Sequence, residues 1–243
     1  MASRRTPPLA ILLPPSEGKA EGGQAPRWKT GAGTFGRALG ARRAEVVAAI
    51  DKAKGGDAKL LGVNGKHLAR AQESNRALVG APTLPAHSRY TGVVWEHLSP
   101  STLSATSRTR AADSIVVVSG LLGVVGFADA VPDYRLKMGA SLAPLGKLST
   151  WWRPSLSDAL NEWADGRFVI DLLPGEHRAA WIPVSDDFAG MVSVSFVEKS
   201  GKVAGHDAKA AKGMLARYLV ESSGDLEKAL REWKHPRFRL TLT

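Results

Sequence analysis

Cysteine is absent from the 243 residues of this chain. The absence excludes disulfides, thiolate zinc sites, cysteine-ligated iron–sulfur clusters and cysteine nucleophiles. Long apolar runs are absent as well, because the longest stretch, over residues 115–125, is interrupted by Ser119 and Gly120. A membrane-spanning helix needs about 20 consecutive apolar residues, so we expect no membrane segment.

Several catalytic signatures are also missing. The chain has no Walker-type loop (GxxxxGK followed by Ser or Thr), no GxSxG nucleophile elbow and no His-x-x-x-His pair. His87, His177 and His206 lie far apart in the sequence, so only the fold can gather histidines into a metal site. We therefore expect neither a bound metal nor a cofactor.

The chain begins with a short basic segment, residues 1–8, which ends in two prolines. The apolar stretch that follows covers only Leu9–Leu13, which is too short for a secretory signal. We expect residues 1–8 to be a disordered basic tail, residues 9–243 to form a single domain, and the protein to be cytoplasmic. An apolar content of 44% and a charged content of 23% fit an ordinary globular protein.

The charge balance points to an anionic partner. The chain carries 33 Lys and Arg residues against 23 Asp and Glu residues, a formal net charge of +10. Net charge informs on partners rather than on fold. Nucleic acid is the commonest polyanionic partner, and a nucleotide or another anionic small molecule is the alternative.

Apolar patterning predicts an α/β (α+β) architecture with a mixed sheet. Continuous or alternating β-branched runs predict strands, and amphipathic segments bounded by Gly, Pro and Asp predict helices. The expected strands cover residues 9–13, 115–119, 168–172, 181–184, 191–198 and 238–243, and residues 90–95 are expected to be a strand or a short loop. The expected helices cover residues 37–53, 67–78, 104–113, a segment starting near 155, 207–222 and 225–234.

The stretch Leu61–Lys66 (LGVNGK) is the most informative part of the sequence. Its pattern, apolar-Gly-apolar-x-Gly-Lys between two helical segments, is typical of a helix-hairpin-helix, here over about residues 41–78. Gly62 and Gly65 permit positive φ and a close backbone approach, and the amides that open the second helix can hold a phosphate. The alternative is an ordinary interhelical loop that needs glycine for its turn.

Basic side chains accompany this hairpin and recur in a later helix. Lys66 and Arg70 add positive charge beside the amides of the second helix. Lys209, Lys212 and Arg217 fall on one broad face of the helix expected over residues 207–222, with small residues between them. Such a face fits a phosphate backbone, although a solvated basic helix face has the same pattern.

A second group of residues has side chains suited to catalysis on an anionic small molecule. In this interpretation two cations hold the anion, a tyrosine or histidine acts as acid or base, and an arginine stabilises charge in the transition state. An exposed turn, an exposed loop histidine and a structural salt bridge are the alternatives for the same residues. The group consists of Lys19, His87, Arg89, Tyr90 and Arg135.

Taken in order, several segments resemble the YaaA peroxide-stress family. They are LLPPSEGK, LLGVNGKHLARA, RYTGVVWEHL, VVVSGLLGVV, PDYRLKMG, the Trp151-Trp152 segment through LSDALNE, VIDLLPGEH and AKAAKGMLARYLV, from about residue 10 to residue 222. Among its departures from the family pattern, PPSEGK replaces an SPAKT-like start, and GVVGF replaces a GVLRP-like run.

The resemblance implies a single α/β domain with a helix-hairpin-helix and a basic cleft. It links the protein to resistance to hydrogen peroxide, to limiting free intracellular iron, and to binding duplex and distorted DNA. Carried over by position, Gly62, Gly65 and Lys66 would hold backbone phosphate. The cleft would be built from Lys19, Arg89, Tyr90, Arg135, Lys209, Lys212 and Arg217.

Residues and resemblance together favour a peroxide-stress protein that binds DNA without sequence preference and helps limit iron-dependent oxidative damage. Double-stranded or distorted DNA is the expected partner, with an anionic small molecule as a second one. The alternative function is an enzyme acting on a nucleotide-like or other anionic small molecule in the basic cleft.

Overall fold

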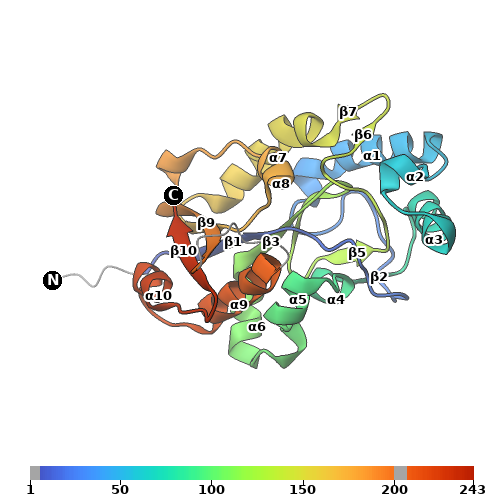
Figure 1. Ribbon diagram of the computed structural model, residues 1–243. Helices are drawn as coiled ribbons and strands as arrows, with labels where there is room; N and C mark the ends of the chain where they lie inside the picture. The colour runs from blue at the N-terminus through green and yellow to red at the C-terminus, as the bar shows by residue number, and fades with distance from the viewer. Residues whose placement is uncertain (1–5, 200–206) are drawn as a thin grey trace.

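A mixed sheet forms the centre of the computed structural model, which describes residues 6–199 and 207–243 (Figure 1). Its strands are β1 (Leu9–Leu13), β3 (Ile115–Ser119), β4 (Gly123–Gly126), β8 (Phe168–Asp171), β9 (Gly190–Glu198) and β10 (Phe238–Leu242). They are arranged in the order β10-β9-β8-β1-β3-β4. Two ribbons pair β2 (Thr83–Pro85) with β5 (Ala130–Pro132) and β6 (Ser141–Leu142) with β7 (Gly146–Lys147).

The strand β1 lies at the middle of the sheet and is buried along its whole length. It pairs in parallel with β3 on one side, where Leu12 is opposite Val116, and in parallel with β8 on the other, where Leu12 is opposite Asp171. Strands that are buried on both faces have continuous apolar sequences. For this reason β1 can be predicted from the sequence. The outer pairs β3–β4 and β9–β10 are antiparallel, so the expected mixed α/β architecture is confirmed.

Helices cover both faces of the sheet. In the view of Figure 1, α1 and α7 lie on one side of the strands, while α5, α6 and α9 lie on the other. The longer helices are α1 (Gly36–Lys52), α3 (Gly65–Arg76), α6 (Ala105–Ser114), α7 (Leu148–Ala164), α9 (Asp207–Glu221) and α10 (Leu226–Glu232). The short ones are α2 (Ala58–Leu61), α4 (Ala86–Arg89), α5 (Val93–Leu98) and α8 (Gly175–Arg178), with 3-10 turns at Pro100–Thr102 and Ser185–Asp187.

Three sequence expectations differ from the structure. Residues 181–184 are irregular rather than a strand, and Ile182 and Val184 are exposed. Residues 90–95 are neither a strand nor a plain loop, because α5 begins at Val93. The helix expected from about residue 155 begins at Leu148, since Pro154 is accommodated inside the first turns of α7. Tertiary packing overrides the local pattern in the two helical cases, where α5 packs on α9 and α7 on α1 and β4.

One continuous hydrophobic core runs from Leu9 to Phe238. The basic tail expected over residues 1–8 falls outside the described residues in its first five positions. No helix in the described part of the chain is long and apolar enough to cross a membrane.

A buried arginine joins α1 to the loop between β3 and β4. Arg43 is 1% exposed, and its guanidinium donates to the carbonyl oxygens of Leu122 (2.9 Å), Val124 (2.8 Å), Thr30 (3.1 Å) and Ala32 (2.7 Å). Burial lowers the pKa of Arg43 to about 10, so the side chain remains a cation at neutral pH. An irregular loop buried beside a sheet needs such donors, because unpaired carbonyls cost free energy.

Replacing Arg43 by Met should therefore destabilise the protein by about 3 kcal/mol or more, because several buried carbonyl oxygens lose their donor at once. Urea-induced unfolding measures this loss. The matched control is Arg37→Met, the same substitution at an exposed position of the same helix, which should change stability by less than about 0.5 kcal/mol. Equal effects of the two substitutions would contradict the structural role of Arg43.

Candidate functional site

Polar residues gather at the carboxyl edge of the sheet. The loop Pro14–Lys19 follows β1, Ser119 ends β3 and Asp171 ends β8. Because β1 is parallel to both β3 and β8, these ends meet at one edge. The chain passes from β1 to one side and later returns to the other, and α/β proteins bind ligands at such a switch in strand order.

The amino group of Lys19 lies at the centre of this edge. Its Nζ donates to the carbonyl oxygen of Ser16 at 2.9 Å and lies 4.1 Å from the ring centroid of Tyr134 and 5.6 Å from that of Tyr90. It forms no ion pair with any residue that the structure describes. Burial lowers the pKa of Lys19 to about 7, against the opposing attraction of the Asp133 carboxylate. The amine is therefore partly neutral at physiological pH.

Two of the three tyrosines in the chain pack beneath this amine. Their hydroxyl groups lie 2.9 Å apart, and the hydroxyl of Tyr134 lies 2.6 Å from Oγ of Ser119. Burial raises the pKa of Tyr134 to about 12 and that of Tyr90 well above its ordinary value. Both phenols therefore stay protonated, and neither can serve as a base at neutral pH.

Paired charges line the rim of the site. Glu17 accepts from Nη2 of Arg135 at 2.5 Å and lies 3.1 Å from Nζ of Lys137. Burial favours a higher pKa for Glu17, but Lys137 and Arg135 outweigh it and hold the pKa below its ordinary value. Beside them, Arg70 contacts Asp133 at 2.9 Å. The rim is thus a set of compensated charges rather than a free basic surface.

Two cavities open on either side of Lys19. The larger, of about 250 Å³, also contains Arg70 and Asp133, and the smaller, of about 50 Å³, also contains Glu176 and His177. Both are lined by Glu17, Lys19, Tyr134 and Arg135. The arrangement suits a small polar molecule held against the Lys19 amine.

His177 is a buried neutral imidazole in the smaller cavity. Burial, with a lesser contribution from Lys212, lowers its pKa to about 4. Its Nδ1 has no hydrogen-bond partner in the described part of the chain and lies 3.8 Å from the carboxylate of Glu176. His177 and Glu176 carry no motif of their own, and only their place after a buried strand hints at a site.

The structure separates the five residues suggested for catalysis. Lys19 and Arg135 line the same cavities, and Tyr90 lies under the Lys19 amine. Arg89 does not line them: it is fully buried, and it donates to the carbonyl oxygens of Val131 (3.1 Å), Gly22 (2.9 Å) and Ala20. His87 stacks on Phe127 at a centroid distance of 4.6 Å, away from both cavities. Ser119, Asp133 and Tyr134 complete the site. The apolar surroundings of Tyr134 and Arg135 in the sequence indicate a buried or cleft-lining pair, which is where the structure places them, whereas no sequence pattern indicates Asp133.

The basic residues of α9 do not form the continuous face that their spacing predicts. Nζ of Lys212 donates to the Leu172 carbonyl at 2.5 Å, and burial lowers its pKa to about 8. Arg217 donates to the Leu98 carbonyl at 3.1 Å and pairs with Glu221 at 2.8 Å. Of the three, Lys209 alone is exposed.

The small residues of α9 serve helix packing inside the protein. Gly213 is buried against α5, where an added Cβ atom would overlap the carbonyl oxygen of Val94 and lie 2.9 Å from Cβ of His97. Ala211 and Ala216 are fully buried as well. The face of α9 that carries these small residues is therefore packed against α5 inside the protein and is not available to an external partner.

The segment expected to be a helix-hairpin-helix, about residues 41–78, folds as the end of α1, the four-residue α2, a turn and α3. The helix directly before the turn is α2, because α1 ends at Lys52. Gly62 ends α2 with φ 63°, and Gly65 opens α3 with φ 56°. Asn64, the N-cap of α3, makes no side-chain hydrogen bond to the helix. Residues 64–67 are exposed.

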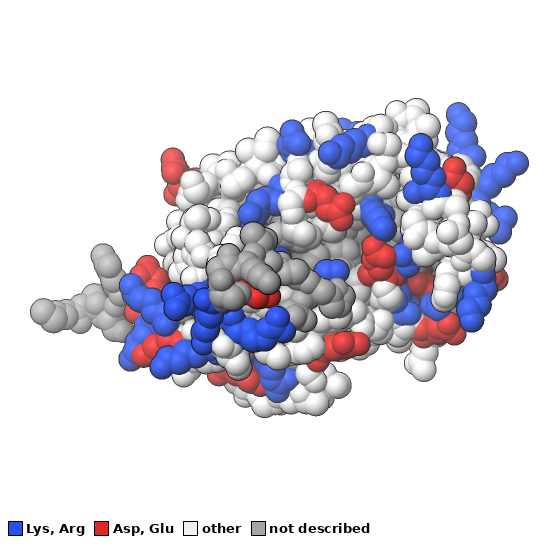
Figure 2. All heavy atoms as spheres, in the orientation of Figure 1, with Lys and Arg blue, Asp and Glu red and all other residues white. Residues whose placement is uncertain are grey.

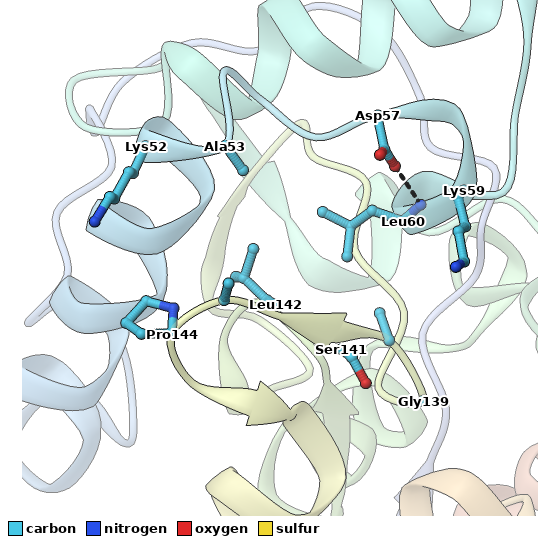
Figure 3. A pocket seen from close by; sticks show the side chains of 11 residues that line it. Lys52, Ala53, Asp57, Lys59, Leu60, Gly139, Ser141, Leu142 and Pro144 are labelled. Carbon is cyan, nitrogen blue, oxygen red and sulfur yellow. Dashed lines mark hydrogen bonds between the residues drawn. The ribbon is translucent and has the colours of Figure 1, made fainter.

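An open cavity of about 820 Å³ lies next to this hairpin, between α1, α2 and residues 139–144 (Figure 3). Leu60 and Leu142 face each other across it, and Lys52 and Lys59 lie at its rim. On the face shown in Figure 2, Lys and Arg side chains gather at the α1–α3 end and again near α9 and α10, with acidic side chains between them.

The glycines of the segment Gly31–Gly36 have the spacing of a dinucleotide-binding loop. The segment does not follow a strand directly, since β1 ends at Leu13. The carboxylate of Asp129 accepts from the amides of Thr34 at 3.0 Å and Gly126 at 2.8 Å. One amide of this segment is thus already bonded to an internal carboxylate. Within residues 6–199 and 207–243, no group of three or more His, Asp or Glu side chains is placed to hold a metal ion.

Comparison with known proteins gives a consistent relationship. The chain matches the sequence model of a family described as "Peroxide stress protein YaaA" over residues 9–242. It is 35% identical to a UPF0246 protein of Streptomyces coelicolor over 92% of this chain and 90% of the relative. It is 34% identical to a UPF0246 protein of Corynebacterium glutamicum over 91% of this chain and 89% of the relative.

The lowered pKa of Lys19 predicts a pH-dependent stability. Between about pH 7, the folded pKa, and 10.5, the ordinary value, the unfolded chain binds more protons than the folded one, so this residue makes stability rise with pH. Lys19→Met should therefore gain stability over the wild type below pH 7 and lose that advantage as the pH approaches 10.5. Urea unfolding across this range measures the difference. An unchanging difference, as expected for the exposed control Lys234→Met, would contradict a desolvated amine.

Proposed function

Because the chain belongs to the peroxide stress protein YaaA family, we propose that it binds the DNA backbone without sequence preference and helps limit iron-dependent oxidative damage. The observation that carries the proposal is the exposed, uncapped start of α3. Asn64 leaves the first-turn amides without a side-chain acceptor, and these amides have no partner within the helix itself. A helix N-terminus in this state favours a phosphate.

Exposed lysines surround this start of α3. Lys66 follows the first residue of the helix and forms no ion pair within the described ranges. Lys59 on α2 and Lys52 at the end of α1 line the adjacent cavity. Together with the amides at the start of α3, these lysines supply the positive groups that a phosphate backbone would contact. We name these residues, Lys52, Lys59 and Gly65–His67, the hairpin track.

Contacts from backbone amides and lysine side chains recognise the phosphates of DNA and not its bases. Backbone amides and lysines fix a protein on the duplex but carry no sequence information. Each phosphate contact releases counterions, so the affinity falls steeply as salt rises. The hairpin track therefore supports sequence-tolerant binding whose strength depends on ionic strength. The Gly62 and Gly65 conformations fit this function because they expose the backbone between them.

A second candidate function is an enzyme acting on an anionic small molecule. The observation that favours it is the Lys19 amine, which lines two cavities at the sheet edge and has no ion-pair partner among the residues that the structure describes. Backbone binding of DNA does not require this arrangement. Arg70 and Arg135 line the larger cavity and supply positive charge, although both also contact carboxylates.

Reversal of one charge tests the hairpin track. Lys66→Glu should weaken binding to duplexes of any sequence by about tenfold and lower the slope of log affinity against log salt by about one unit. Fluorescence anisotropy with several unrelated duplexes measures both. The matched control is Lys234→Glu, at an exposed lysine two residues after α10. In Figure 1, α10 and α3 lie at opposite ends of the molecule. A loss confined to some sequences, or equal in the control, would refute the proposal.

A substitution at the N-cap separates stability from binding. Asn64→Asp places a carboxylate beside the free amides, so it should stabilise α3 by about 0.5 kcal/mol while it competes with phosphate. We expect unfolding in urea to shift to higher concentration and DNA affinity to fall. If affinity is unchanged while stability rises, the start of α3 does not contact the backbone.

A further inference from the structure

A lysine placed as Lys19 is unusual for a purely structural residue. Its Nζ has one hydrogen bond, to the Ser16 carbonyl at 2.9 Å, and no carboxylate partner among the described residues. The neighbouring carboxylates are already paired: Glu17 contacts Arg135 and Lys137, and Asp133 contacts Arg70. The amine nevertheless lines both cavities, so a small molecule can reach it.

We propose that Lys19 is the nucleophile of an imine-forming site for a small anionic aldehyde or ketone. This inference rests on the second candidate function and names its substrate class and chemistry. It is independent of DNA binding by the hairpin track. The cavity of about 250 Å³ accommodates a compound of a few heavy atoms, which excludes a dinucleotide.

The reaction needs no oxidant, reductant or cofactor. The nitrogen lone pair of Lys19 attacks the carbonyl carbon, and a C–N bond forms as the C=O π electrons move to oxygen. That oxygen takes up protons and leaves as water, while the amine loses its two protons, so that amine and carbonyl yield imine and water. Lysine amines that form such adducts must be neutral, and burial lowers the pKa of Lys19 to about 7.

The surroundings of the amine fit the product as well as the reactant. Once the imine nitrogen takes up a proton from water, its positive charge lies over the ring of Tyr134, whose centroid is 4.1 Å from Nζ of Lys19. The anionic group of the substrate faces Arg135 and Arg70, which line the same cavity. Both arginines are already paired with carboxylates, Arg135 with Glu17 and Arg70 with Asp133 and Glu21. An anionic substrate would compete with these carboxylates for the two guanidinium groups.

Reductive trapping with glyoxylate as the probe tests the inference. The full-length protein is incubated at neutral pH with glyoxylate and cyanoborohydride, and peptide mapping locates carboxymethyl-lysine. Lys19 should be labelled about tenfold faster than exposed Lys66 and Lys234, because an ordinary lysine with a pKa near 10.4 is almost entirely protonated. Its labelling rate should level off above about pH 7, whereas the rates of the exposed lysines should keep rising. Labelling of Lys19 no faster than that of the exposed lysines would overturn the proposal.

Two further measurements separate failure of the chemistry from failure of the site. Glycolate keeps the carboxylate but lacks the carbonyl group, so it should slow the labelling of Lys19 without forming an adduct. Isothermal titration then measures glycolate binding to the wild type and to Arg135→Met. If glycolate binds only the wild type but glyoxylate does not label Lys19 preferentially, the imine is refuted and the anion-binding site is supported. If neither compound binds or reacts at Lys19, both the imine and the small-molecule function are refuted. A Lys19→Arg variant that retains the wild-type circular dichroism spectrum keeps the cation and should give no adduct at residue 19.

Discussion

The parallel pairing of β1 with β3 and with β8 is the constraint on which the rest of the structure depends. It buries Leu9–Leu13 completely and brings the ends of three strands to one edge. The loop after β1 must then turn sharply over the sheet, and it places Lys19 above two buried tyrosines. The position of the amine, its low pKa and the cavities beside it all follow from this edge.

Much of the positive charge of the protein is used internally. Arg43 and Arg89 are buried and donate hydrogen bonds to main-chain carbonyls. Lys212 and Arg217 of α9 donate in the same way to carbonyls of neighbouring segments. A guanidinium has five donors in a fixed plane, so one arginine can satisfy several carbonyls of an irregular loop. The formal net charge of +10 therefore overstates the basic surface available to a polyanion, and the hairpin track is a small part of it.

The hairpin and the sheet edge are joined through one side chain. Arg135 donates to the Leu61 carbonyl of α2 at 3.0 Å and to Glu17 of the β1 loop at 2.5 Å. Its backbone amide also donates to Asn75 of α3 at 2.9 Å. The two proposed functions thus occupy neighbouring and mutually supported parts of the molecule. Each uses its own groups: exposed amides and lysines at the start of α3 and beside it, and the desolvated Lys19 amine at the cavities.

Local patterning by itself determined the buried strands, most helices and the family. Continuous β-branched runs such as residues 115–119 are typical of buried strands. The glycines at positions 62 and 65 indicate backbone with positive φ, which the structure has at both. The partner of each polar side chain was decided only by tertiary structure. The sequence around Arg89 or Lys212 does not show that their side chains donate hydrogen bonds to carbonyl oxygens of distant segments. The sequence around Lys19 does not show that Tyr90 and Tyr134 pack against its amine and exclude water from it. The physical reason is that burial and hydrogen bonding depend on contacts between distant segments, such as Arg217 with Leu98 (119 residues apart) and Arg167 with Leu9 (158 residues apart), which no local pattern records.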